Sequence, residues 1–284
     1  MSIEFKNVSY IYSPKSPFAA VGLKNASFSF KKGSFSMIVG KTGSGKSTIA
    51  QLSNALLSPS EGEVHVDTLI NANKIKKKKK TIRAIRKKVG LVFQFPEYQL
   101  FEESVEKDVA FGPRNFGLSK EEALKKAHDS LKQIGLDESF YKRSPFELSG
   151  GEKRKVALAG ILAIEPEILI VDEPTSGLDP FSAKEVMKIF KKINETGVTI
   201  IVITHDMNLV LEYADNVLLV NDGKIILEST PSELFSKDME EYSLNNPLVI
   251  DFANSLKKRG FAIDISKIRN VNDLALAIKN GRKR

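Results

Sequence analysis

The sequence predicts an α/β fold in which helices cover a mainly parallel sheet. Short apolar runs recur along the chain, and longer segments with helical periodicity separate them, an alternation that is typical of parallel sheets. The runs are residues 36–39, 89–93, 168–171, 198–203 and 217–220. Because such sheets bind ligands at the carboxyl ends of their strands, we expect the functional residues there.

The amino-terminal part of the chain follows a different pattern. Residues 3–30 alternate apolar and polar side chains with a period of two, which predicts antiparallel strands with one buried face. We therefore expect an antiparallel β subdomain ahead of the parallel sheet.

Two further parts of the chain have mainly helical patterns. Residues 120–134 predict an amphipathic helix that begins after the possible cap Ser119 and ends at Gly135. This helix lies in a helical subdomain at about 97–150. After residue 228 the pattern changes to short helices, at residues 231–235, 247–258 and 271–278. The sequence thus predicts a main domain, 1–228, and a small helical extension, 229–284.

Composition excludes several classes of protein. The chain has 284 residues, 42% of them hydrophobic, which is enough for an ordinary folded core. It has no cysteine, which excludes disulfides, thiolate metal sites and cysteine nucleophiles and permits a reducing compartment. No window approaches the roughly 18 consecutive apolar residues of a membrane span, and the start of the chain lacks the apolar core of a signal peptide. We expect a cytoplasmic protein that does not cross a membrane by itself.

The basic charge is local. The net charge is +8, but residues 71–90 hold ten basic residues and no acid, and residues 255–284 hold nine basic and two acidic residues. The five lysines at 76–80 are best explained as a solvated loop, with contact to anionic lipid as an alternative. Nucleic acid is disfavoured, because no aromatic residues are interleaved for base stacking.

A glycine-rich stretch predicts a phosphate site. Residues 40–47 fit G-x-x-x-x-G-K-[ST] between an apolar run and a helical segment. Glycines let the backbone wrap a polyphosphate with its N–H groups inward, and the helix adds its positive end. Lys46 would reach the β and γ phosphates and Ser47 would ligate Mg²⁺, whereas a plain turn would not need this setting. The candidate nucleotide-binding residues are Gly40, Lys41, Thr42, Gly43, Ser44, Gly45, Lys46, Ser47 and Thr48.

Two carboxylates follow another predicted strand. The apolar run 168–171 ends in Asp172 and Glu173, the Walker B arrangement of a buried strand that delivers acids to its carboxyl edge. Asp172 would hold Mg²⁺ directly or through a water, and Glu173 would polarise an attacking water. The alternative, that both acids only cap the next turn, is weak beside a phosphate loop.

One of the three histidines has a functional setting. His205 follows the apolar run 198–203 and would lie at the sheet edge that carries the phosphate and metal groups. There it can donate a hydrogen bond to a γ-phosphate. His65 and His128 have no such setting, so we expect them on the surface.

The order of these motifs resembles the ATP-binding-cassette (ABC) ATPases over residues 3–233. The match comprises the phosphate loop, Gln94, LSGGE at 148–152, VDEP at 171–174, SGLD at 176–179 and His205. The resemblance implies a P-loop ATPase domain that binds ATP and Mg²⁺, with Gln94 near the metal and the water.

The same resemblance implies a head-to-tail pair of ATPase domains that sandwich two nucleotides. Ser149, Gly150 and Gly151 would close over the partner's γ-phosphate. Glu152 stands where glutamine is commonest in this family, and Asp179 would communicate across the joint. An aromatic residue near the amino terminus would stack on adenine; Tyr12 is the match, with Tyr10 as the alternative.

A second resemblance concerns Phe95, Pro96, Glu97 and Gln99. With Tyr98 they are similar to the short helix after Gln94 in energy-coupling factor (ECF) transporter ATPases. Phenylalanine before Pro96, proline after Glu173 and an extended insertion after Tyr12 resemble the second of the two ATPase types of these transporters.

The ECF resemblance implies three partners. They are an ATPase of the first type, a membrane coupling subunit, and a membrane protein that binds a vitamin or a transition metal ion. Phe95, Pro96, Glu97 and Gln99 would dock the coupling subunit, and we expect a basic side chain of that subunit to pair with Glu97. Phe95, Leu100 and Phe101 could instead be core residues. The extension after residue 228 resembles a dimerisation segment.

The expected function is therefore ATP hydrolysis that energises uptake of a micronutrient, at the cytoplasmic face of the membrane. A conventional ABC transporter subunit is the first alternative, although it need not carry the Pro96-Glu97-x-Gln99 pattern. An ABC ATPase acting on nucleic acid or ribosomes is disfavoured, because the chain has one cassette and no long heptad or zinc insertion. A structural protein with a dead site is weaker still, since every catalytic position is filled.

Overall fold

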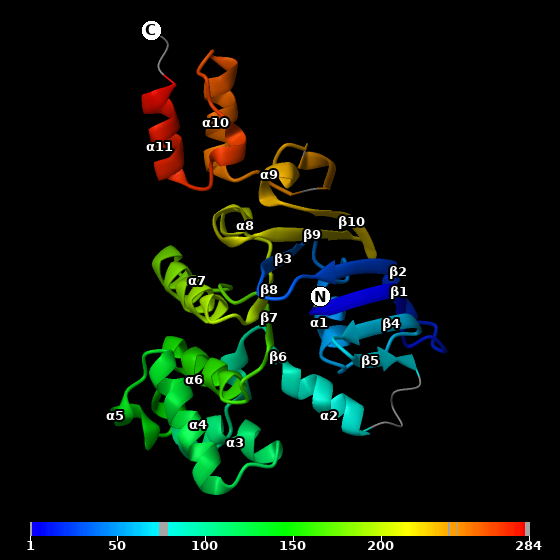
Figure 1. Cartoon of the computed structure of the whole chain (residues 1–284), viewed down its shortest axis with the longest axis vertical. Helices are drawn as coiled ribbons and strands as arrows, with labels where there is room; N and C mark the ends of the chain where they lie inside the picture. Colours follow the sequence, from blue (N-terminus) through cyan, green and yellow to red (C-terminus); the bar gives the residue numbers. More distant parts are fainter. Residues whose placement is uncertain (1, 74–78, 238, 243, 282–284) are drawn as a thin grey trace.

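Two sheets organise the part of the chain that the computed structural model describes, which is residues 2–73, 79–237, 239–242 and 244–281 (Figure 1). The first sheet is antiparallel, with the strand order β2-β1-β4-β5. Its strands are β1 (Ile3–Tyr12), β2 (Ala20–Phe30), β4 (Glu61–Val66) and β5 (Leu69–Ala72). The prediction of antiparallel strands before the main sheet is confirmed.

The second sheet has the order β10-β9-β3-β8-β7-β6. Its neighbours pair in parallel except β9 and β10, which are antiparallel. All five apolar runs predicted as strands lie in this sheet, so the mainly parallel α/β fold is confirmed. The strands are β3 (Phe35–Val39), β6 (Val89–Val92), β7 (Ile168–Asp172), β8 (Thr199–Ile203), β9 (Asn216–Asn221) and β10 (Lys224–Ser229).

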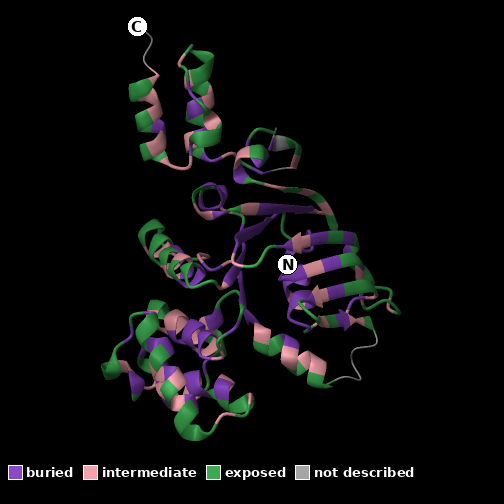
Figure 2. Ribbon diagram, in the orientation of Figure 1, coloured by how far each residue is buried: buried purple, intermediate pink, exposed green. Residues whose placement is uncertain are grey.

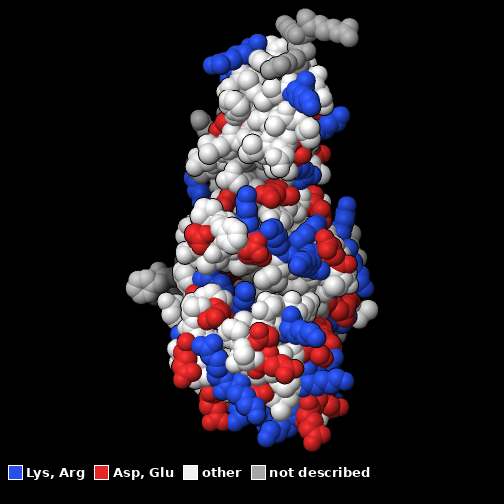
Figure 3. Space-filling model, turned by 90° about the vertical axis from the view of Figure 1, so that its left-hand side faces the viewer, with Lys and Arg blue, Asp and Glu red and all other residues white. Residues whose placement is uncertain are grey.

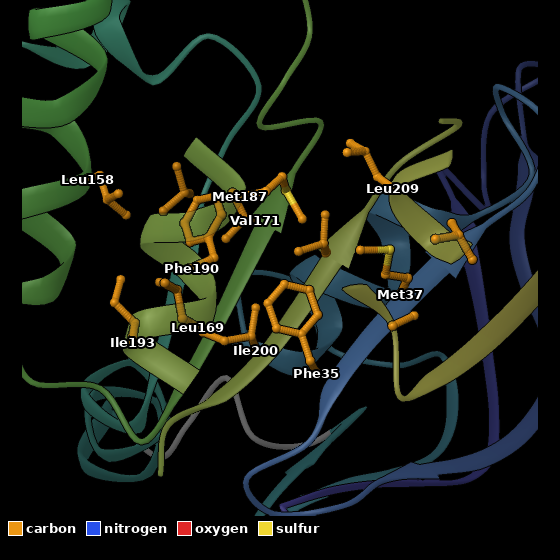
Figure 4. Close-up of a cluster of buried hydrophobic side chains, with 14 of the residues drawn as sticks. Phe35, Met37, Leu158, Leu169, Val171, Met187, Phe190, Ile193, Ile200 and Leu209 are labelled. Atoms are coloured by element: carbon orange, nitrogen blue, oxygen red, sulfur yellow. The ribbon is translucent and has the colours of Figure 1, made fainter. Parts of the chain in front are cut away.

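The core lies on both faces of this second sheet, whose central strands are buried (Figure 2). Successive side chains of a strand point to opposite faces, so Ile200 packs among the helices while Ile201 packs toward the antiparallel sheet. On the helical face, Leu169 and Ile200 of the sheet lie beside Phe190 of α7 (Figure 4). Burial on both faces explains why these strands are continuous apolar runs.

Helices complete the main domain. Those outside the helical subdomain and the carboxyl-terminal extension are α1 (Lys46–Ser53), α2 (Lys79–Lys88), α7 (Pro180–Glu195) and α8 (Met207–Tyr213). The lysines at 76–78 lie outside the described residues. Lys79 and Lys80 begin α2, so the expectation of a loop is wrong for these two. They belong to the same helical segment as the residues that follow them.

The helical subdomain lies at one end of the molecule (Figure 1). As predicted, α4 begins after its cap Ser119, whose hydroxyl accepts from the Glu122 amide while the Glu122 side chain accepts from the Ser119 amide. This capping box satisfies two amides that the helix itself leaves free. The elements are η2 (Pro96–Gln99), α3 (Val105–Asn115), α4 (Lys120–Gln133), α5 (Glu138–Tyr141), η3 (Pro145–Glu147) and α6 (Gly150–Leu162).

The carboxyl-terminal extension lies at the opposite end (Figure 1). Its elements are α9 (Pro231–Leu234), η4 (Glu240–Tyr242), α10 (Leu248–Lys258), η5 (Ile265–Lys267) and α11 (Val271–Asn280). Arg269 connects it to the main domain, because its Nη1 donates to the carbonyls of Leu211 and Ala214 at the end of α8, at 3.2 and 3.1 Å. Among the described residues, none of the helices combines the length and apolar character that a bilayer span requires.

Candidate functional site

The phosphate loop is shaped by backbone that only glycine can adopt. Gly40 and Gly45 have φ angles of 148° and 109°, in the region that disfavours other residues. A Cβ at Gly40 would lie 2.0 Å from the Val220 carbonyl oxygen, and one at Gly45 would lie 2.4 Å from that of Gly22. The loop is therefore held against β9 and β2, and it leads directly into the amino-terminal end of α1, where free amides favour an anion.

Lys46 is buried and folded over this loop. Its Nζ donates to the carbonyls of Gly40 and Lys41, each at 2.8 Å. Burial lowers the pKa of Lys46, while the nearby carboxylates of Glu173 and Asp172 act in the opposite direction. The Ser44 hydroxyl is buried and has no hydrogen-bond partner among the described residues. A poorly solvated cation beside an unused donor fits a phosphate group.

Ser47 and Asp172 are brought together from α1 and β7. The Ser47 hydroxyl donates to Asp172 Oδ2 at 2.7 Å. Burial raises the pKa of Asp172, whereas the hydrogen bond from Ser47 and the charge of Lys46 lower it. A hydroxyl and a carboxylate are the oxygen donors that Mg²⁺ prefers, so these residues fit that ion. Gln94, the third predicted ligand, instead donates to the Ser176 hydroxyl at 3.4 Å.

Glu173 and His205 form a pair at the same sheet edge. His205 Nδ1 lies 3.0 Å from Glu173 Oε1, and the His205 side chain is 73% exposed. Glu173 has a φ of 49°, a conformation that costs energy for a non-glycine residue and is common at functional sites. Its amide donates to the Ile203 carbonyl at 2.9 Å, which anchors this conformation on β8. The pair can orient a water and accept its proton.

One opening beside the loop includes residues that the sequence did not point to. It has a volume of about 440 Å³, and Thr42 and His205 line it together with Asn245 and Asn246 of the carboxyl-terminal extension. Asparagine is common in loops, and its sequence pattern carries no sign of a distant partner. Only the packing of the extension places these two residues at the rim of the site.

Tyr12 reaches the same region from β1. Its hydroxyl lies 2.9 Å from Thr48 Oγ1 on α1, and its ring meets that of Tyr10 edge to face, with 4.7 Å between centroids. Tyr12 is thus the aromatic residue tied to the phosphate-loop helix. Its stacking on adenine stays a prediction.

The residues of the LSGGE motif begin α6. Ser149 caps the helix and forms a capping box with Glu152, whose carboxylate accepts from the Ser149 amide at 2.8 Å. Glutamate adds a negative charge at the positive end of the helix, which explains why it is acceptable at this position. Ser149, Gly150 and Gly151 are exposed. Ser149 and Gly151 line a separate cleft of about 760 Å³.

Asp179 has a structural role within its own chain. It caps α7 by accepting from the amides of Phe181 and Ser182, at 2.9 and 3.1 Å. These hydrogen bonds and that of the Ser182 hydroxyl lower the pKa of Asp179. A role across a subunit joint stays a prediction.

Glu97 already has a basic partner within its own chain, and its pairing with a side chain of the coupling subunit stays a prediction. The cation beside Glu97 is Arg154 of α6, with Arg154 Nη2 2.9 Å from Glu97 Oε1. No local sequence pattern indicates this pairing, because 57 residues separate the two. Leu100 is buried, as the core alternative held, but Phe95 and Phe101 are exposed.

The other two histidines are not simple surface residues. His65 Nε2 lies 3.0 Å from Glu63, and His128 Nε2 lies 3.0 Å from Glu106. His128 also stacks on Tyr141 with 4.3 Å between ring centroids. Both are half-buried, because neighbouring carboxylates and an aromatic ring provide structural partners.

Comparison with protein families finds a match to the ABC transporter model over residues 23–176. Among curated proteins, the chain is 48% identical to the energy-coupling factor transporter ATP-binding protein EcfA2 of Lactococcus lactis subsp. lactis (strain IL1403), over 98% of this chain and 99% of that protein. It is 51% identical to EcfA2 of Streptococcus pneumoniae serotype 2, over 92% of this chain and 93% of that protein.

Solved structures of ABC transporter ATPases also match this chain. The structure of CbiO1 from Clostridium perfringens, part of the ABC transporter complex CbiONQ, matches with a TM-score of 0.74 and 36% identity, over 91% of this chain and 97% of that one. The ATP-binding cassette MJ0796, a dimer bound to ADP and Pi, matches with a TM-score of 0.70 and 33% identity, over 81% of this chain and 98% of that one.

Proposed function

This chain belongs to the ABC transporter family and, within it, to the ECF transporter ATP-binding proteins, and from this premise we propose how its residues act. It is the ATP-binding and hydrolysing subunit of an ECF-type transporter. The observation that carries the assignment of roles is the convergence of the Ser47–Asp172 and Glu173–His205 pairs on one sheet edge beside the phosphate loop.

The proposed chemistry is in-line transfer of the γ-phosphoryl group of ATP to water. Amides of the loop 40–45 hold the phosphates, and Lys46 exchanges its contacts with loop carbonyls for phosphate oxygens. Ser47, Asp172 and Gln94 are the residues that would hold Mg²⁺, which when bound supplies positive charge to the phosphate oxygens. Glu173 orients the water and accepts its proton, and His205 donates to the γ-phosphate.

We assign the other half of each site to a second ATPase chain. The exposed Ser149, Gly150 and Gly151 offer a hydroxyl and free amides at the start of α6, which is a second anion-binding helix end. Such an arrangement can complete the site of a facing subunit, with Asp179 beside the joint.

The carboxyl-terminal extension has the surface expected for association. Leu248, Phe252, Val271 and Leu276 are exposed on α10 and α11, and the face of the extension in Figure 3 carries fewer charged side chains than the rest of the molecule. An apolar surface of this kind marks an interaction site. We propose that it pairs with the extension of another ATPase, of the first ECF type.

The docking surface for the membrane coupling subunit is proposed around η2. Pro96 is buried and fixes the helix, whereas Phe95, Tyr98 and Phe101 are exposed beside Glu97 and Gln99. Aromatic residues are enriched at protein interfaces. Through this surface the chain would work at the cytoplasmic face of the membrane and energise uptake of a vitamin or a transition metal ion, which a separate membrane protein selects.

Purification of the tagged chain from its native membrane tests these assignments. We expect a second, related ATPase, a membrane coupling subunit and a small substrate-binding membrane protein to copurify. A conventional ABC permease in their place would contradict the ECF partners. Copurifying ribosomes would overturn the transport assignment.

A further inference from the structure

Arg154 joins three parts of the molecule at a point between the docking surface and the ATP site. It projects from α6, five residues after Ser149. Its Nε and Nη2 donate to both carboxylate oxygens of Glu97 on η2, at 3.2 and 2.9 Å. Its Nη1 donates to the carbonyls of Pro174 and Ser176, at 3.3 and 3.2 Å. One guanidinium thus connects η2, α6 and the loop that follows Glu173.

The burial and charge of this contact make it stronger than a surface ion pair. The side chains of Arg154 and Glu97 are 14% and 15% exposed. Burial alone would raise the pKa of Glu97, but hydrogen bonds from Arg154 and the backbone, together with the charge of Arg154, hold this pKa below its ordinary value. The bidentate geometry restricts the relative orientation of η2 and α6.

The loop held by Arg154 carries residues of the proposed mechanism at both ends. It begins at Glu173, which pairs with His205, and ends at Asp179, which caps α7. Ser176 in the middle also receives the hydrogen bond from Gln94. Gln94 and Glu97, three residues apart, therefore both connect to this loop, one directly and the other through Arg154.

We propose that Arg154 is a positioning residue for ATP hydrolysis that transmits the position of η2 to the loop 173–179. This inference rests on the proposed function, since it requires η2 to be the docking helix and Glu173 to act on water. A lysine cannot replace Arg154, because a single ammonium lacks the planar fork that reaches a carboxylate and two carbonyls together. A partner that draws Glu97 away from Arg154 would also release the carbonyls of Pro174 and Ser176.

The test compares Arg154→Lys with the wild type in the complete transporter complex reconstituted in liposomes. We expect kcat for ATP to fall on the order of 10- to 100-fold, because small displacements of catalytic groups cost about this much, while KM for ATP changes less than about 2-fold. The matched control is Glu103→Gln, which removes the exposed pair of Glu103 with Lys107; such pairs contribute little, so kcat should stay within about 2-fold. A wild-type kcat for Arg154→Lys would refute the proposal.

A charge exchange separates positioning from a simple structural ion pair. The double variant Glu97→Arg with Arg154→Glu can restore the ion pair but leaves the carbonyls of Pro174 and Ser176 without a donor from residue 154. Because Glu97 belongs to the proposed docking surface, this variant is assayed as the full chain without membrane subunits, beside the wild-type and Arg154→Lys chains under the same conditions. We expect it to melt within a few degrees of the wild type, yet to keep the low kcat of Arg154→Lys. Full recovery of kcat would refute the proposal, because it would show that the hydrogen bonds to Pro174 and Ser176 do not affect hydrolysis.

If these variants fail to fold, exchange of backbone amides in the wild-type complex and in Glu97→Gln provides the second measurement. We expect faster hydrogen–deuterium exchange at residues 174–179 in Glu97→Gln, and unchanged exchange would refute the proposal. Failure of the proposed function is distinguishable, because it would appear in the wild type as absent ATP hydrolysis or absent assembly with a membrane subunit.

Discussion

At the scale of single residues, the site depends on side chains that the fold holds in costly environments. Lys46 is buried with a lowered pKa, Asp172 is half-buried with a raised one, and Glu173 adopts a positive φ. Hydrogen bonds hold each side chain in this environment. Loop carbonyls hold Lys46, the Ser47 hydroxyl holds Asp172, and the backbone of β8 holds Glu173. Such environments are expected where charge must develop or move during a reaction.

Glu173→Gln should separate binding from hydrolysis. The amide keeps the size of the side chain but cannot accept a proton, so kcat of the assembled complex should fall at least about 100-fold. ATP affinity, measured by titration with a fluorescent analogue, should change less than about 3-fold. Glu195→Gln, at the exposed end of α7, is the control and should hydrolyse normally. Normal turnover by Glu173→Gln would remove its assigned role.

Lys46→Ala should weaken ATP binding itself. It removes a charged donor to the phosphates, and hydrogen bonds to charged groups contribute about 1.5–3 kcal/mol. The dissociation constant for ATP should therefore rise roughly 10- to 100-fold in an equilibrium titration. The effect would differ in kind from that of Glu173→Gln, and unchanged affinity would contradict the phosphate role.

At the scale of elements, helix starts have two separable functions. Ser119 and Ser149 form the same kind of capping box with the glutamate three residues later. The box on α4 is structural, whereas the one on α6 also presents exposed glycines to a proposed partner site. The two helices therefore offer an internal comparison between stability and catalysis.

Ser119→Ala and Ser149→Ala should destabilise the chain by similar amounts. Loss of a serine cap costs about 1 kcal/mol, which thermal unfolding of the isolated chain can detect. Only Ser149→Ala should lower ATP hydrolysis by the assembled complex, because only Ser149 is assigned to the partner's phosphate. Equal activity of the two variants would contradict the proposal that Ser149 contacts the phosphate bound by the partner chain.

At the scale of the whole molecule, the chain combines the proposed ATP site with two helical parts to which we assign different interactions. The helical subdomain lies at one end of the elongated chain and the carboxyl-terminal extension at the other (Figure 1). Asn245 and Asn246 of the extension line the opening beside the site, and Arg269 of the extension contacts the end of α8. Since α8 begins two residues after His205, the extension contacts the element that follows the site.

The isolated chain should hydrolyse ATP slowly. In the proposed arrangement the phosphate loop of one chain is completed by the anion donors of a second chain, and removal of a single such donor in enzymes costs about 10²–10³ in kcat. Turnover per chain should therefore be about 100-fold or more below that of the complete complex, measured by phosphate release. Full activity of the isolated chain would refute the half-site arrangement.

Charges on the apolar face of the extension should impair association. We expect Leu248→Asp with Phe252→Asp to reduce copurification of the second ATPase at least about 10-fold, because each change places a carboxylate in an apolar interface. ATP affinity should be unchanged. Lys258→Asp, exposed on the same helix, is the control and should copurify normally.

The sequence by itself determined the features that depend on neighbours in the chain. Apolar runs predicted the central strands, the 40–47 pattern predicted a loop that leads into α1, and Ser119 with Gly135 predicted the limits of α4. These features are local, because strand and helix periodicities, turns and caps are formed by residues a few positions apart.

Only the tertiary structure decided the contacts between distant residues. It pairs Glu97 with Arg154, and it brings Arg269 to the end of α8 and Asn246 to the rim of the site. An ion pair or a carbonyl contact has no periodic signature, since its geometry exists only after helices and strands have packed. Local patterns therefore predict the type of chemistry, whereas the contacts between distant residues around the site follow from the packing of the whole chain.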